Sequence, residues 1–357
     1  MKNKNHKILR DYLIGWFIAA LIWFLLSNVH NVEHVEIYSP NSSFWEETLI
    51  MGMFWLVQGL GFYALHIFIE RFVTGRVPFI KLMAITITFQ LVIAVLAIAL
   101  FFVIIKIFTD LIQTSSVWEI LQLPLIPTAI FYALVVNFGI SISIRVSMIL
   151  GDGTLFKIIT GKFYQPKVEE LIFMFLDLKG STTIAERIDH TDYSKLLQDC
   201  FYDLAVVHQF KAEIYQYVGD EAVLVWNTTD GINNMNCIKA YYAFEERIID
   251  KASYYQEKYG IVPEFKAGLQ IGEVTVAEVG ELKREIAYHG DTINTASRIQ
   301  KQCNALRAEL LVSEKLLNLL ELTPSVRSIA KGAFHLQGKK EELNLFAIEK
   351  NTWSSQS

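Results

Sequence analysis

Two aspartates in the C-terminal half stand where predicted strands end beside glycine turns. The run 170–178 is an apolar segment with Asp177 near its end, so it predicts a buried strand that ends in an acid. Gly180, Ser181 and Thr182 follow and lead into a helical pattern, whose first turn would present free backbone N–H groups to an anion. An acid beside such a turn predicts a site for a metal and a phosphate together.

The second aspartate lies in a predicted hairpin. Residues 213–227 alternate in the manner of two strands, and the Gly219–Asp220 pair between them is a strong turn signal. Two carboxylates at adjacent strand ends, with few other ligands, suit Mg²⁺ or Mn²⁺ shared with a triphosphate. Taken singly, Asp220 is a turn residue and Asp177 a helix cap, but their combination favours the metal site.

A third set of polar groups lies on a predicted helix that begins at Thr292. Asn294 and Arg298 are four residues apart, so they project from one helix face. Asparagine can both donate and accept hydrogen bonds, and arginine presents a planar fork for phosphate oxygens. The alternative is that these are two polar residues on an exposed helix face.

These residues are carried by a segment with the composition of an ordinary soluble domain. From about residue 167 the charges are regular, and the pattern predicts a long helix over 232–259 and strands over 264–271 and 274–279. The formal net charge of -5 argues against nucleic acid as a partner. The three cysteines have no metal-type spacing and indicate free thiols in a reducing compartment.

The first 145 residues have a different character, because long apolar runs dominate them. A bilayer core of about 30 Å needs about 20 apolar residues as a helix, so residues 1–145 are predicted to be a four-helix transmembrane domain in contact with membrane lipid. Basic residues gather before the first span, between the second and third, and after the fourth. That distribution predicts a multi-pass protein of the cell membrane with both termini and the C-terminal half in the cytoplasm. The spans cover 12–29, 48–69, 79–108 and 123–144.

Polar residues in and between the spans have more than one interpretation. Gln58 and Asn137 lie inside spans and are expected to form interhelical hydrogen bonds. His30 and His34 of the first outer loop could form a metal or proton sensor, or belong to an ordinary solvated loop. Residues 146–168 are predicted to be a linker whose glycines end the fourth helix. It could transmit motion or act as a passive tether.

The C-terminal half resembles the class III adenylyl/guanylyl cyclase catalytic domain over residues 169–350. Three stretches carry the resemblance in the family's order and spacing: FMFLDLKGSTTIAE, YQYVGDEAVLVW and HGDTINTASRI. The resemblance implies an α/β domain, a βαββαβ sandwich of the ferredoxin-like class found in polymerase palms. It also implies conversion of ATP to 3′,5′-cyclic AMP and pyrophosphate by a homodimer whose active sites are shared between subunits.

The resemblance assigns roles to individual residues. Asp177 and Asp220 resemble the aspartates that bind two Mg²⁺ or Mn²⁺ ions per active site. The backbone carbonyl of Leu178 would bind the second metal. Asn294 resembles the ribose-positioning asparagine, and Arg298 resembles the transition-state arginine.

Three positions depart from the family pattern. Gln216 and Ala287 stand where adenylyl cyclases carry the residues that select the base, so a guanylyl or dual-specificity cyclase using GTP is an alternative. Gln337 stands where the family has a C-terminal lysine that contacts the triphosphate. Lys339 or Lys340 could replace that lysine, and Lys283 or Arg284 could also bind phosphates. From a different class, the chain could be a receptor with a degenerate, inactive cyclase module.

Overall fold

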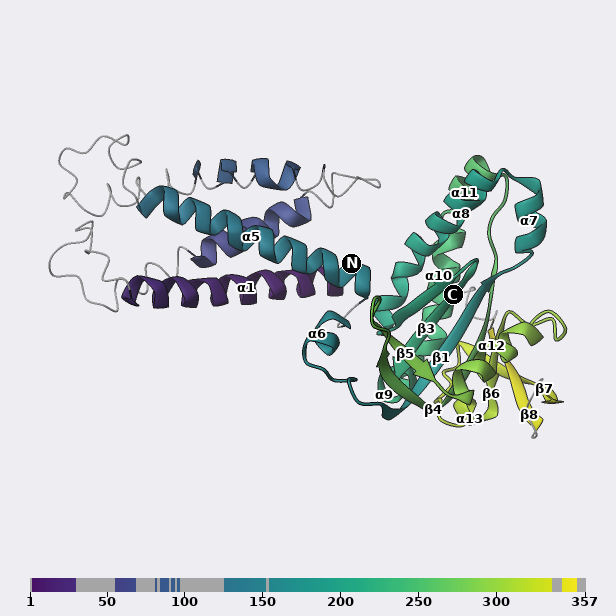
Figure 1. The fold of residues 1–357 in the computed structure, drawn as a ribbon. Coiled ribbons are helices and arrows are strands. Elements are labelled where there is room, and N and C mark those ends of the chain that lie inside the picture. Colours follow the sequence, from purple (N-terminus) through teal and green to yellow (C-terminus); the bar gives the residue numbers. More distant parts are fainter. Residues whose placement is uncertain are drawn as a thin grey trace. The chain divides into compact units, whose positions relative to one another are not determined.

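The computed structural model describes most of the C-terminal half of the chain and parts of the N-terminal half. The described residues are 2–29, 55–68, 81, 84–89, 91–93, 95–96, 125–151, 154–335 and 342–351. The chain divides into two compact units, Met1–Ile149 and Leu150–Ser357. The first is helical and the second is built around a β-sheet (Figure 1).

The N-terminal unit packs its helices through aromatic rings and a glycine. Trp16 stacks on Trp55 and Phe62, with ring centroids 5.3 Å and 5.9 Å apart. Gly15 lets another helix approach, because a Cβ at this position would lie 2.6 Å from Cδ1 of Ile140. The described helical segments include α1 (Lys2–Val29), residues 55–68, and α5 (Leu125–Leu150).

One helix among the described residues, Ile8–Leu25 within α1, is long and apolar enough to cross a membrane. Shorter apolar helices cover Trp55–Phe68, Ala84–Ile93 and Phe131–Ser147. The four predicted spans are therefore not confirmed as four. Part of the second span and most of the third lie outside the described residues, and so does the first outer loop with His30 and His34.

The segment predicted to be a linker starts in the last turn of α5, contains a helix break at Gly151 and then packs on the sheet. Helix α5 ends at Leu150, and Gly151 has a φ of +90°, in agreement with the helix break predicted there. In the following helix, α6 (Thr154–Ile159), the Nζ of Lys157 lies 3.0 Å from Oε2 of Glu213. The side chain of Phe163 is buried in the core of the sheet unit. Much of this segment is therefore part of the C-terminal unit.

The C-terminal unit is built on an eight-stranded mixed sheet in the order β2-β3-β1-β4-β6-β8-β7, with β5 paired to β4. Its first elements follow one another as βαββαβ. Their spatial order, β2-β3-β1-β4 with antiparallel neighbours, is the predicted ferredoxin-like arrangement. The strands are β1 (Lys167–Leu178), β2 (Glu213–Val218), β3 (Glu221–Asn227), β4 (Phe265–Val279), β5 (Glu285–His289), β6 (Leu310–Ser313), β7 (Val326–His335) and β8 (Glu342–Lys350).

Helices cover both faces of this sheet (Figure 1). Because side chains alternate along a strand, Met174 and Leu176 of β1 pack in the core beneath α8, α10 and α11, whereas Phe173 and Phe175 pack in the core beneath α12. Asp177 continues the second set, so it belongs to the α12 face. The helices are α8 (His190–Asp203), α10 (Asn236–Asp250), α11 (Ala252–Tyr259) and α12 (Asp291–Gln302).

The structure differs from the sequence-based expectation at two places. The single helix expected over 232–259 is divided, and α10 and α11 separate at Lys251. The two strands expected before and after Gly272 are one continuous strand, β4. A Cβ on Gly272 would lie 2.5 Å from Oγ1 of Thr292, so this glycine makes room for α12 and does not form a turn.

Candidate active site

The two predicted aspartates are brought together at one end of β1. Asp177 is the penultimate residue of β1, and Asp220 lies in the turn between β2 and β3. Because β3 pairs with β1 so that Glu221 is opposite Asp177, the turn lies beside the end of β1. Both aspartates are partly buried.

The surroundings raise the pKa of Asp177. The largest cause is burial, which disfavours the charged carboxylate, and the second is the negative charge of Asp220. A hydrogen bond from Gln300 and the charges of Lys266 and Lys301 act in the opposite direction. Burial and the negative charge of Asp220 therefore outweigh the opposing effects of Gln300, Lys266 and Lys301.

A third carboxyl group, that of Glu221, lies beside the two aspartates, opposite Asp177 in the sheet. The pKa of Glu221 is raised to about 7, mainly by burial and then by the charge of Asp177. Among the described residues, no group of three or more His, Cys, Asp or Glu side chains forms a candidate metal site. Mg²⁺ characteristically binds one or two carboxylates and takes its remaining ligands from water and substrate phosphates. The Asp177–Asp220 pair therefore fits Mg²⁺ or Mn²⁺ bound together with a phosphate substrate.

Three further residues border the aspartates and were not predicted from the sequence. Gln300 of α12 donates a hydrogen bond from Nε2 to Oδ2 of Asp177 at 3.0 Å. Lys266 lies opposite Asp177 on β4, is buried, and donates to Oδ1 of Asn304. The pKa of Tyr193 on α8 is raised by burial and then by the charges of both aspartates. Strand register and helix packing place these residues, and neither can be read from a local sequence pattern.

The glycine turn predicted to bind phosphate follows β1 directly. Gly180 has a φ of +69° and precedes the short helix α7 (Ser181–Arg187), of which Ser181 is half-buried and Thr182 exposed. The side chain of Leu178 is buried in the core, so only its backbone is available to a metal. The roles of these residues remain predictions.

Asn294 and Arg298 occupy the outer side of α12, away from the aspartates of the same chain. Asn294 is exposed, and Nη1 of Arg298 lies 4.0 Å from Oδ1 of Asp291 on the same helix. In the described part of the chain, neither residue forms a hydrogen bond or ion pair with Asp177 or Asp220. One chain therefore contains two separate groups of predicted site residues.

The two predicted base-selecting positions lie on strands whose side chains meet on the α12 face. Gln216 is exposed on β2 beside a bulge, and Ala287 is buried on β5 opposite Ala277. Their chain neighbours Tyr215 and Tyr288 are in edge-to-face contact, with centroids 4.8 Å apart. The two strands therefore come close to each other although they are not neighbours in the sheet.

The predicted triphosphate contacts are engaged with carboxylates of their own hairpin or lie outside the described residues. Nζ of Lys283 is 2.9 Å from Oε2 of Glu285, and Nη1 of Arg284 is 3.1 Å from Oε1 of Glu278. Lys339 lies outside the described residues. A triphosphate would have to compete with these glutamates for Lys283 and Arg284.

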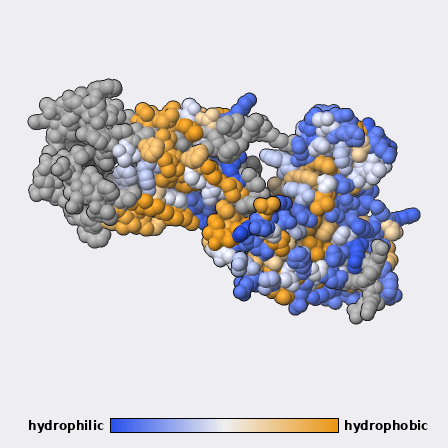
Figure 2. Space-filling view, viewed as in Figure 1, coloured by the Kyte–Doolittle hydropathy of each residue, from blue (hydrophilic) through white to orange (hydrophobic). Residues whose placement is uncertain are grey.

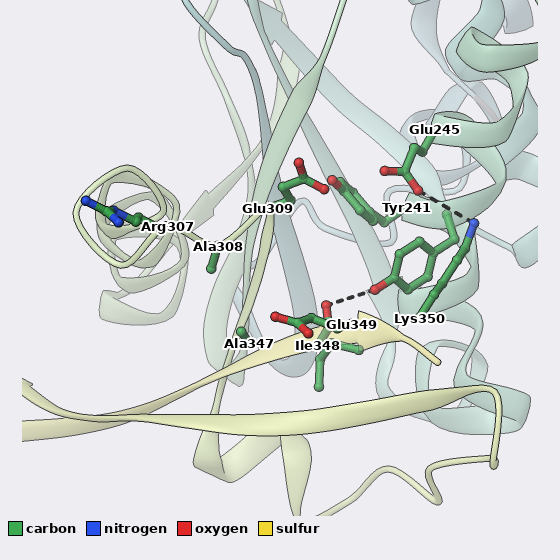
Figure 3. Close-up of a pocket in the computed structure, with 10 residues that line it drawn as sticks. Tyr241, Glu245, Arg307, Ala308, Glu309, Ala347, Ile348, Glu349 and Lys350 are labelled. Atoms are coloured by element: carbon green, nitrogen blue, oxygen red, sulfur yellow. Dashed lines mark hydrogen bonds and ion pairs between the residues drawn. The ribbon is translucent and has the colours of Figure 1, made fainter. Parts of the chain in front are cut away.

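A cavity of about 330 Å³ lies elsewhere in the unit, between α10 and β8 (Figure 3). Its lining includes Tyr241 and Glu245 of α10, Glu309 before β6, and Lys350 of β8. Nζ of Lys350 lies 3.6 Å from Oε2 of Glu245. None of the predicted site residues lines this cavity, so it is separate from the aspartate site.

Comparison with known proteins agrees with the predicted family. The family described as the adenylate and guanylate cyclase catalytic domain matches residues 163–350. Adenylate cyclase 2 of Rhizobium meliloti (strain 1021) is 33% identical over 218 residues, which are 61% of this chain and 60% of that relative. Adenylate cyclase of Anabaena cylindrica is 24% identical over 189 residues, 50% of this chain and 36% of that relative. The match therefore spans 60% or less of the length of these two relatives.

A solved structure of a bacterial light-regulated adenylyl cyclase has a similar fold. It matches with a TM-score of 0.52 and 16% sequence identity, and the match covers 68% of each chain.

Proposed function

Because the chain belongs to the adenylate and guanylate cyclase catalytic domain family, we propose that residues 169–350 convert ATP to 3′,5′-cyclic AMP and pyrophosphate. The observation that carries this proposal is the pairing of Asp177 with Asp220, two partly buried carboxylates; the pKa of Asp177 is raised by burial and then by the charge of Asp220. Such a pair suits a divalent cation bound with a nucleoside triphosphate.

Two Mg²⁺ or Mn²⁺ ions per active site would be held by Asp177, Asp220 and the backbone carbonyl of Leu178. When bound, the ions neutralise the polyphosphate and favour ionisation of the attacking hydroxyl. The Gly180–Thr182 turn would contribute backbone N–H groups to the phosphates. Lys266, opposite Asp177 on β4, adds positive charge at the same edge of the site.

The reaction needs orientation and charge stabilisation from the protein. The ribose 3′-oxygen attacks the α-phosphorus, and pyrophosphate leaves. Asn294 would hold the ribose so that the cyclising geometry is reached at a lower entropy cost. Arg298 would stabilise the charge on the α-phosphoryl oxygens in the transition state.

The protein is proposed to act as a homodimer with composite sites. Asn294 is exposed on α12, the side chain of Arg298 is 31% exposed, and neither contacts the aspartates of its own chain in the described residues. In a closed two-fold dimer, each chain can supply aspartates to one site and the asparagine and arginine to the other. This arrangement would use both groups that one chain contains.

Residues 1–145 are proposed to be a multi-pass membrane domain with both termini in the cytoplasm. Figure 2 shows apolar residues, in orange, over much of the described surface of the helical unit. Phe17 is 72% and Phe131 68% exposed, whereas Gln58 and Asn137 are buried. This distribution suits lipid better than water, because exposed apolar area is costly in water. We expect the protein to stay in the membrane fraction during alkaline extraction. A reporter enzyme that works only in the cytoplasm should be active when it is fused after residue 150. Extraction as a soluble protein would overturn this assignment.

The catalytic proposal is tested with the full-length protein purified in detergent. Wild type and Asp177→Ala would be incubated with Mn²⁺ and either ATP or GTP, and the product identified by mass spectrometry. Cyclic AMP from wild type, and none from the variant, is the expected result. Cyclic GMP as the main product would favour the guanylyl alternative, and no cyclic product from either nucleotide would contradict the proposal.

A further inference from the structure

Gln300 holds one oxygen of the aspartate that is predicted to bind metal. The Gln300 side chain is 5% exposed, and its Nε2 donates to Oδ2 of Asp177 at 3.0 Å. This is the one hydrogen bond to the Asp177 side chain in the described part of the chain. The other oxygen, Oδ1, is therefore left for a different partner.

The backbone beneath Gln300 is held in place by close packing of α12 on β4. A Cβ on Gly268 would overlap the backbone nitrogen of Gln300, so only glycine allows this approach. Gly268 lies opposite Phe175, two residues before Asp177 on the neighbouring strand. At the start of the helix, Oγ1 of Thr292 donates to the carbonyl of Glu273 at 2.9 Å. The distance between Gln300 and Asp177 is therefore set by rigid elements on both sides.

On the basis of the proposed cyclase reaction, we infer that Gln300 is a positioning residue for the metal site of its own chain. It fixes the Asp177 carboxylate by one oxygen so that Oδ1 is presented to the ion. Residues that hydrogen-bond a metal ligand typically change metal affinity by about 10- to 100-fold when they are replaced. Arg298 is two residues away on α12, about 200° around the helix, so it faces away from this contact. Gln300 and Arg298 of one chain would thus serve different sites.

The first test is direct Mn²⁺ binding by Gln300→Met, which keeps the side-chain volume and removes the donor. Binding would be measured by calorimetry on the full-length dimer with 2′,3′-dideoxy-ATP, which cannot cyclise. The expected result is a loss of Mn²⁺ affinity of about 10-fold or more. Gln270→Met is the matched control, because Gln270 is also buried on the α12 face of β4 but makes no contact with Asp177 in the described residues. Unchanged affinity in Gln300→Met, or an equal loss in both variants, would overturn the inference.

The second test separates the two sites of a dimer. A mixed dimer of Asp177→Ala and Arg298→Ala chains keeps one intact site, whose aspartates come from the Arg298→Ala chain. Gln300→Met in that chain should raise the Mn²⁺ concentration for half-maximal activity by about 10-fold. In the Asp177→Ala chain it should leave this concentration as it was. Equal shifts in both placements would indicate a general structural effect and contradict the positioning role.

These tests distinguish the inference from the proposed function. If wild type forms no cyclic nucleotide and Gln300→Met still weakens Mn²⁺ binding, the proposed reaction is wrong and the positioning role stands. If wild type is an active cyclase and Gln300→Met binds Mn²⁺ as wild type does, the positioning role is wrong and the reaction stands.

Discussion

The two sides of helix α12 differ in the contacts that their polar residues make within the same chain. The side that faces the sheet is packed against β4, and Gln300 on it is hydrogen-bonded to Asp177. The outer side carries Asn294 and Arg298, whose polar contacts in the described part of the chain are with Gly290, the residue before the helix, and with Asp291 of the helix itself. The inner side therefore contacts the aspartate site of its own chain. Asn294 and Arg298 on the outer side contact neither aspartate of their own chain in the described residues. The difference suggests that the outer side is completed by a second subunit.

Loss of an aspartate on the inner side should have the largest effect on activity. We expect Asp177→Ala or Asp220→Ala to reduce cyclic nucleotide formation to background, because each removes a ligand from a shared metal site. The melting temperature should not fall, since repulsion between the two carboxylates is relieved. Activity near that of wild type in either variant would contradict the metal assignment.

Loss of Arg298 from the outer side should lower activity nearly as much. A second subunit that still carries Arg298 should restore part of that activity. Arg298→Ala is expected to lower kcat by about 10³-fold, the smaller end of the range for transition-state arginines in phosphoryl transfer. Co-expression with Asp177→Ala should restore up to about half of the wild-type activity per mixed dimer, because one of its two sites is intact. A mixture that stays inactive, despite demonstrated association of the two variants, would mean that the site is built within one chain.

Changes at the two base-selecting positions should have a smaller effect, which concerns the preference for ATP over GTP. We expect wild type to prefer ATP only weakly, because Gln216 can hydrogen-bond either purine and Ala287 has no polar side chain. The double variant Gln216→Lys, Ala287→Asp should raise the ratio of kcat/KM for ATP to that for GTP by about 10-fold. A clear wild-type preference for GTP, or no change in the ratio, would place base selection elsewhere.

The smallest expected effect concerns stability of the metal-free protein. Glu221 has its pKa raised to about 7 in the folded state, so between its ordinary value of 4.5 and 7 the folded protein retains a proton that the unfolded chain has lost. Its contribution to stability therefore falls as pH rises through that window. Glu221→Gln should be more stable than wild type at pH 8 by about 1 kcal/mol, allowing for partial exposure.

Thermal unfolding in EDTA at two pH values checks this prediction about Glu221. The difference in melting temperature should disappear near pH 4.5, where the wild-type side chain is protonated in the folded state. A difference of the same size at both pH values would show that it does not arise from the charge of Glu221.

Features with a local signature could be predicted from the sequence. The apolar run before Asp177, the Gly219–Asp220 turn and the helical spacing of Asn294 and Arg298 were all found, because strand and helix periods can be read within a short window. The family resemblance carried by these stretches implied the βαββαβ arrangement, which the sheet confirms. The interruption predicted at Gly272 was wrong, because a glycine that makes room for a helix looks the same in sequence as one that forms a turn.

Only the tertiary structure decided which residues surround the aspartates. Lys266 and Glu221 lie opposite Asp177 because of strand register, and register depends on how the apolar residues of several strands are buried together. Gln300 reaches Asp177 across 123 positions of the sequence because α12 can pack closely on Gly268. Neither pairing leaves a local pattern, since each depends on the simultaneous placement of segments far apart in the chain.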